Sequence, residues 1–191
     1  MPFLDDLVDG LNDKWQQPLS CFGSPRMFGI AETMYAQQQG EEAPMRYPAT
    51  VGNDAEVMAI DVNDSYPITI YHKLDSIVNG FSKINSFGDS YGNETEVVNM
   101  SLMVWAWRSK VLRPAYWLEN FLKDSMPVSS KSPNIQITNY RVGNSTFDKV
   151  ALIGREYSAV DVNYPDLMVF EMKYRIESTY RKGCFVINNG C

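Results

Sequence analysis

The chain has 191 residues, of which 45% are hydrophobic and 13% aromatic, and it carries a formal net charge of −6. This length suits one domain with a sizeable core, and the composition excludes an intrinsically disordered chain. The acidic balance argues against a protein that grips nucleic acid with clustered lysine and arginine. It is compatible with a protein that surrounds DNA without adhering to it, since like charge opposes adhesion. We therefore predict one domain over residues 1–191.

The three cysteines are Cys21, Cys184 and Cys191, an odd number without C-x-x-C spacing. This pattern favours free thiols in a reducing compartment and does not match the ligand spacing of a zinc site. The acidic start of the chain differs from the basic start of a secretory signal, and no apolar run approaches the ~20 residues that span a membrane. We expect no metal site, no secretion and no membrane association.

Residues 3–17 predict an amphipathic helix that ends before Pro18. Its apolar positions recur at helical intervals: Leu4, Leu7, Val8, Leu11 and Trp15. The pattern does not distinguish a helix packed on its own domain from one packed on a neighbouring subunit. Residues 18–55 contain many prolines and glycines and predict an irregular arm or loop. Because long irregular segments with methionine and aromatic residues are often functional, we expect this arm to order against a partner.

Residues 56–62 and 67–74 predict two strands that pair as a hairpin around a polar turn. Residues 75–95 are rich in glycine, serine and asparagine and predict a connection. Residues 96–108 then predict the central strand. One of its faces would carry Val98, Met100, Leu102, Val104 and Ala106, and the other Asn99, Ser101, Met103, Trp105 and Trp107. Residues 114–124 predict a helix, whose buried face would comprise Trp117, Leu118, Phe121 and Leu122.

Residues 134–142 predict a further strand, and Ser145 with Asp148 resembles a capping box for a helix to about residue 159. Residues 168–177 predict the last strand, with one apolar face that needs helices to cover it. Its other face must meet water or the charges of a partner. The elements together predict an α+β fold: a mixed, largely antiparallel β-sheet over residues 56–180, with helices packed on one face, and a short tail over residues 181–191.

No catalytic motif is recognisable: the sequence has no G-x-S-x-G elbow, Walker loop, dinucleotide fingerprint or H-E-x-x-H. The single histidine, His72, lies in a predicted strand, where a structural role is more frequent than catalysis. Asp61 and Asp64 flank a turn, where aspartate usually caps backbone groups. Glu171 and Glu177 share a strand face, where glutamate usually pairs with lysine. We predict no catalytic residues, no cofactor and no enzyme; an enzyme centred on His72 and a cysteine stays open as an alternative.

The order of elements over residues 97–180 resembles the tail-terminator and neck (head-to-tail connector) ring proteins of tailed bacteriophages. Residues 99–105 look like the central strand of those proteins, and residues 114–127 look like the helix that follows it. Residues 147–157 and 168–180 are similar to their second helix and final strand.

This resemblance implies a structural virion protein, assembled in the host cytoplasm, with no cofactor and no catalytic residues. Such subunits form a homo-oligomeric ring together with other neck or tail proteins, and double-stranded DNA passes through the lumen. Residues 18–55 depart from the resemblance, because they are longer and more irregular than a minimal terminator needs.

A ring subunit must expose two different complementary surfaces. The basic cluster of Arg108, Lys110 and Arg113 is either a solvated linker or a contact with acidic groups of an adjoining subunit. The other candidate interface residues are the central-strand tryptophans, the charged face of the last strand and apolar residues of the arm: Trp105, Trp107, Glu171, Lys173, Arg175, Glu177, Met27, Phe28, Met34 and Tyr35. We expect neighbouring subunits, rather than the same chain, to shelter the aromatic side chains. The alternative function is a monomeric, non-enzymatic protein- or ligand-binding module that uses the aromatic sheet face.

Overall fold

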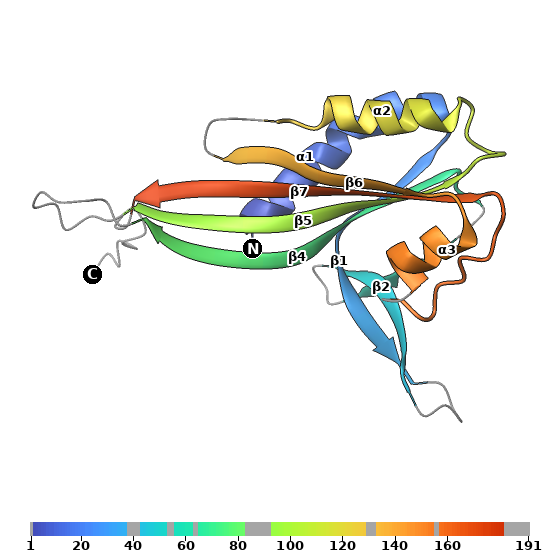
Figure 1. Ribbon diagram of the computed structural model, residues 1–191, viewed down its shortest axis with the longest axis horizontal. Helices are drawn as coiled ribbons and strands as arrows, with labels where there is room; N and C mark the ends of the chain where they lie inside the picture. The colour runs from blue at the N-terminus through green and yellow to red at the C-terminus, as the bar shows by residue number, and fades with distance from the viewer. Residues whose placement is uncertain are drawn as a thin grey trace, which may run out of the picture.

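The computed structural model describes residues 2–37, 43–52, 56–62, 65–82, 93–128, 133–154 and 157–181 (Figure 1). Its helices are α1 (Pro2–Leu19), α2 (Ala115–Ser125) and α3 (Thr146–Lys149), with a 3-10 turn η1 (Ser20–Phe22) and a π turn η2 (Val150–Gly154). Its strands are β1 (Pro25–Ala36), β2 (Met45–Val51), β3 (Val57–Ala59), β4 (Ile68–Ser82), β5 (Asn93–Trp107), β6 (Asn134–Gly143) and β7 (Leu167–Arg181). None of the helices in these segments is long and apolar enough to cross a membrane.

The strands form one seven-stranded sheet in the order β3-β2-β1-β4-β5-β7-β6. Strand β1 runs parallel to β4, and every other pairing among the described strands is antiparallel. The predicted α+β class with a mixed, largely antiparallel sheet is therefore confirmed. Strands β4, β5 and β7 are long and lie side by side, and they project well beyond the helices in Figure 1.

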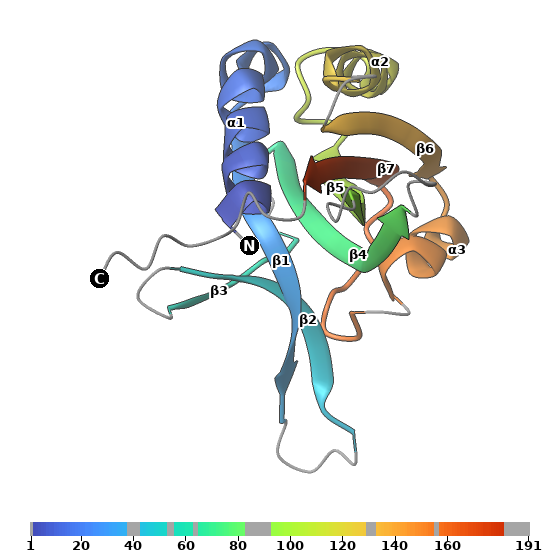
Figure 2. The same ribbon diagram turned by 90° about the vertical axis from the view of Figure 1, so that its left-hand side faces the viewer.

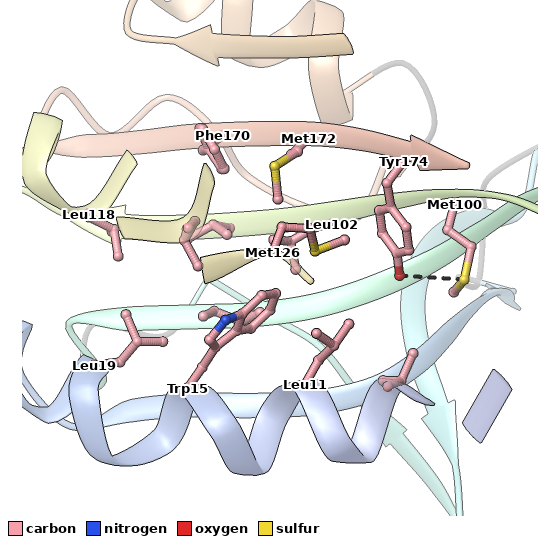
Figure 3. Close-up of a cluster of buried hydrophobic side chains, with 14 of the residues drawn as sticks. Leu11, Trp15, Leu19, Met100, Leu102, Leu118, Met126, Phe170, Met172 and Tyr174 are labelled. Carbon is pink, nitrogen blue, oxygen red and sulfur yellow. Dashed lines mark hydrogen bonds between the residues drawn. The ribbon is translucent and has the colours of Figure 1, made fainter. Parts of the chain in front are cut away.

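The first core lies between the sheet and helices α1 and α2, which cover the same face (Figure 2). The apolar stripe of α1 packs on its own sheet, so the choice that the sequence left open is resolved. Figure 3 shows Trp15 of α1 pointing into this core toward β5 and β7. The even-numbered residues of both strands face it, as predicted: Val98, Met100, Leu102, Val104 and Ala106 of β5, and Met168, Phe170, Met172, Tyr174 and Ile176 of β7.

The second core lies on the opposite face of the sheet, at the end where β5 finishes and β7 begins. Helix α3, the turn η2 and the segment after it cover the sheet there, whereas helices had been expected on one face.

The helix predicted to reach residue 159 is shorter, with α3 passing directly into η2. Its predicted capping box is confirmed, because the Asp148 backbone N–H donates to Ser145 Oγ (3.1 Å) and the Ser145 backbone N–H donates to Asp148 Oδ2 (3.4 Å).

The prediction of an irregular arm over residues 18–55 is wrong for the two segments that form β1 and β2. These strands pair in an antiparallel register from Glu32 opposite Ala49 to Ala36 opposite Met45. Pro25 is tolerated because it begins β1, and Pro48 lies inside β2, where its carbonyl accepts a hydrogen bond from the Ile60 N–H (2.8 Å). Pairing with neighbouring strands, which local composition does not report, makes this segment regular.

Three further boundaries differ from the prediction. The hairpin of residues 56–62 with 67–74 does not form, because β3 pairs with β2 while β4 pairs with β1 and β5. The predicted connection of residues 75–95 contains the outer half of β4 and the first three residues of β5, and the register of these two strands ends with Ser82 opposite Asn93. Helix α1 continues through Pro18, whose missing N–H removes a single hydrogen bond from the last turn.

Candidate functional site

Two of the candidate interface aromatics lie inside the chain's own second core. Trp105 is 2% exposed and its ring meets that of Tyr71 edge-on at 5.3 Å, and Phe28 is also buried. The expectation that neighbouring subunits shelter them is wrong, because η2 and the segment around Val162 cover this end of the sheet. The sheet face of Trp105 is therefore filled by the chain itself and offers that side chain to no ligand or partner.

The other apolar candidates are more accessible. Trp107 is half-buried, with Tyr164 edge-on at 5.2 Å, and Met27 and Met34 are half-buried as well. Tyr35, near the end of β1, is 65% exposed. Of the four candidate interface residues in the arm, Tyr35 is therefore the one that is strongly exposed.

The charged face of β7 is largely neutralised within the chain. Glu171 is buried and receives Nε (2.7 Å) and Nη2 (2.5 Å) of Arg141 on β6. Arg175 pairs with Glu177 at 3.0 Å in a half-exposed position, and Lys173 is half-buried beside them. This face is consistent with a solvated sheet surface that has its own ion pairs.

Removal of the Arg141 side chain is expected to destabilise the fold more than removal of Arg175. Arg141→Ala leaves the buried carboxylate of Glu171 without its partner, which should cost about 1–3 kcal/mol. Arg175→Ala breaks a partly exposed pair and should cost about 0–1 kcal/mol. Urea unfolding of both variants measures the difference, and equal losses would contradict this account of Glu171.

His72 is a core residue with no solvent access. Its Nδ1 is hydrogen-bonded to the Tyr174 hydroxyl at 2.8 Å, and that hydroxyl also lies 3.4 Å from Met100 Sδ. The ring stacks on Trp15 at 6.1 Å. Burial lowers the pKa of His72 to about 3 and raises the pKa of Tyr174. The structure places His72 in the core and Cys21 on the surface, so it does not bring these two together in an open site, and Cys184 and Cys191 lie outside the described residues.

An aromatic groove lies between the C-terminal end of α1 and helix α2, and sequence reasoning missed it. Its cavity volume is about 600 Å³, and its lining residues are Pro18, Cys21, Phe22, Arg113, Tyr116, Trp117, Asn120 and Phe121. Trp117, predicted to be buried, is 45% exposed, and Tyr116 beside it is 60% exposed. The sequence feature that could have indicated this groove is the aromatic pair of Tyr116 and Trp117 at the start of α2, which lies at the edge of the apolar stripe of that helix.

The loop before α2 gives the aromatic groove its basic edge. The Leu112 backbone N–H donates to the Phe22 carbonyl at 3.0 Å, which holds the loop against η1. The guanidinium of Arg113 lies 5.2 Å from the Trp117 ring, a cation–π contact. The Leu112 side chain on the same loop is 74% exposed, whereas Lys110 lines a separate cavity, with its Nζ 5.8 Å from the centre of the Trp107 ring. One residue of the basic cluster singled out in the sequence, Arg113, therefore borders an apolar surface.

A second, acidic hollow lies beside the N-terminal half of α1, where β2 and β3 meet. Its cavity volume is about 330 Å³, and its lining residues are Asp5, Val8, Asp9, Gly29, Ile30, Thr50, Val51, Gly52, Glu56 and Met58. This lining contains three carboxylates and neither lysine nor arginine. Val51 and Met58 are about half exposed at its rim. The hollow is therefore apolar and acidic, whereas the groove is aromatic and basic.

The two surfaces lie at opposite ends of one helix. The hollow uses the first half of α1 and the groove uses its last turn, and the 18 residues of α1 span about 27 Å. Figure 2 shows α2 beside the one end of α1 and β3 near the other. The chain thus presents two different apolar surfaces of opposite charge.

The chain matches no family model and no curated protein.

Proposed function

We propose that this protein is a structural subunit that assembles head-to-tail with copies of itself into a ring, in the neck or tail of a tailed bacteriophage. The observation that carries this proposal is the presence of two non-equivalent exposed apolar surfaces, the aromatic groove and the acidic hollow. A two-fold dimer needs one self-complementary surface, whereas a ring needs two that differ.

The exposed aromatics of the groove support an interface rather than a free surface. Leu112, Tyr116 and Trp117 are neighbours on one loop and helix, and all three are substantially exposed. Proteins rarely leave contiguous apolar surface in water unless a partner covers it, and tryptophan and tyrosine are enriched where subunits meet. The resemblance of residues 97–180 to phage ring proteins supplies the remaining context. In that context the partners are other neck or tail proteins, and the net charge of −6 suits a lumen through which double-stranded DNA slides.

The alternative function, a monomeric binding module, would now have to use the aromatic groove, because Trp105 is enclosed. The volume of the groove lies within the roughly 300–1,000 Å³ of small-molecule pockets. A monomer that binds one ligand at defined stoichiometry would favour that alternative over a ring.

Light scattering and native mass spectrometry across a wide concentration range test the proposal directly. We expect a discrete oligomer that negative-stain images show as a ring, either with the purified chain or on addition of neck and tail partners. A chain that stays monomeric at every concentration, alone and with those partners, would overturn the proposed function.

A further inference from the structure

We propose that the acidic hollow of one copy seats on the aromatic groove of the next, so that these two surfaces form the head-to-tail contact; this inference rests on the proposed function. The occupant of the groove is therefore a second copy of this chain.

Charge complementarity selects this pairing. The hollow is lined by the carboxylates of Asp5, Asp9 and Glu56, and the groove is lined by the guanidinium of Arg113. Two copies that each carry a net charge of −6 repel one another on average, so the approach that brings opposite charges together is favoured. Groove against groove or hollow against hollow would place like charges opposite each other.

The apolar parts of the two surfaces also match in kind. Val51 and Met58 stand half exposed at the hollow and would cover the exposed rings of Tyr116 and Trp117. Methionine adapts its shape and makes favourable contacts with aromatic rings. The pairing would remove the exposed apolar side chains on both sides from water at once, leaving the charged groups at the rim.

The position of the surfaces sets the direction of assembly. Because they lie at opposite ends of α1, a copy that uses its hollow still presents its groove to a further copy. Such a contact propagates, and it closes into a ring when the rotation between copies is a simple fraction of a full turn. A contact between identical surfaces would instead stop at a dimer.

Disulfide trapping tests the contact with a cysteine that the groove already contains. Cys21 is exposed and lines the groove, and Met58→Cys places a second thiol on the hollow. With Cys184 and Cys191 replaced by serine, mild oxidation should yield a ladder of covalent dimers, trimers and higher species on a non-reducing gel. Cys21→Ser should abolish the ladder. Val128→Cys, an exposed position outside both linings, should give none.

Charge reversal provides an independent measurement on the unlinked protein. Arg113→Glu, or Asp9→Lys with Glu56→Lys, should weaken self-association by about tenfold or more. All three substitutions in one chain restore complementarity and should recover most of the assembly. Added salt should weaken the wild-type oligomer, because it screens exposed charges.

The outcomes separate this contact from the proposed function. A wild-type oligomer that forms no ladder and is unaffected by either charge reversal overturns the contact and leaves the ring proposal standing. A wild-type chain that is monomeric under all conditions overturns both. A product that stops at a covalent dimer shows an isologous contact and overturns the head-to-tail arrangement.

Discussion

Trp117→Ala is expected to dissociate the proposed head-to-tail oligomer while leaving the chain folded. Trp117 is 45% exposed and its ring forms a wall of the aromatic groove, where a neighbouring copy would bury it. Tryptophan at the centre of an interface typically contributes about 2 kcal/mol or more, which corresponds to roughly a 30-fold weaker association. The free energy of unfolding of the isolated subunit should change by no more than about 1 kcal/mol, because the side chain is only partly packed in the monomer.

Trp105→Ala is the matched control for this prediction. Trp105 is enclosed in the second core, so its truncation leaves a large cavity and should lower the free energy of unfolding by about 3–5 kcal/mol. Trp105→Phe, which keeps most of the volume, serves if the alanine variant does not fold. Light scattering reports assembly and urea unfolding reports stability for each variant. A Trp117→Ala chain that assembles with wild-type affinity would show that the groove is not a subunit contact.

The two tryptophans show what sequence patterns can and cannot establish. A period of two residues places Trp105 correctly on the face of β5 opposite Leu102. The pattern does not report which residues cover that face. The cover is provided by Ile153, Tyr157 and Val162, which lie some 50 residues further along the chain. The burial of Trp105 was therefore not predictable from local sequence.

The groove was missed for a related reason. The helical pattern correctly predicted α2 and its buried Leu118 and Leu122. Trp117 and Phe121 lie on the edge of the same stripe, and their burial depends on how far α1 and η1 extend over α2. The distance between two helices is set by the tertiary fold and not by the local sequence. A helical stripe that is uniformly apolar in the sequence can therefore contain both buried and exposed positions.

The outer half of β4, residues 75–82, has the composition expected of a connection, because it contains serine, asparagine and glycine. On the side of the sheet away from α1 and α2, Ser76 lies opposite Asn99, and Ser76 Oγ accepts from the Asn99 amide (2.9 Å). Such residues suit a strand face that water reaches, yet serine and asparagine are also typical of loops. The strands β5 and β7 were easier to predict, because their apolar faces alternate without interruption.

The buried histidine makes stability depend on pH in a predictable direction. Burial lowers the pKa of His72 to about 3, whereas the unfolded chain should titrate near the ordinary value of 6.5. Above pH 6.5 the imidazole is neutral in both states and has no effect on the pH dependence. Between these two values the unfolded state binds a proton that the folded state excludes, so stability falls as the pH falls. Below about pH 3 both states are protonated and the loss is complete.

Urea unfolding between pH 7.5 and 5 measures this effect, because His72 is the single histidine of the chain. Each pH unit below 6.5 should cost up to about 1.4 kcal/mol, so about 2 kcal/mol should be lost between pH 6.5 and 5. His72→Gln can still hydrogen-bond to Tyr174 but does not titrate. Its stability at pH 7.5 should be lower than that of the wild type, and its slope over this range should be much flatter. Equal slopes for the two proteins would mean that His72 takes up a proton in the folded state, which its enclosure between Trp15 and Tyr174 opposes.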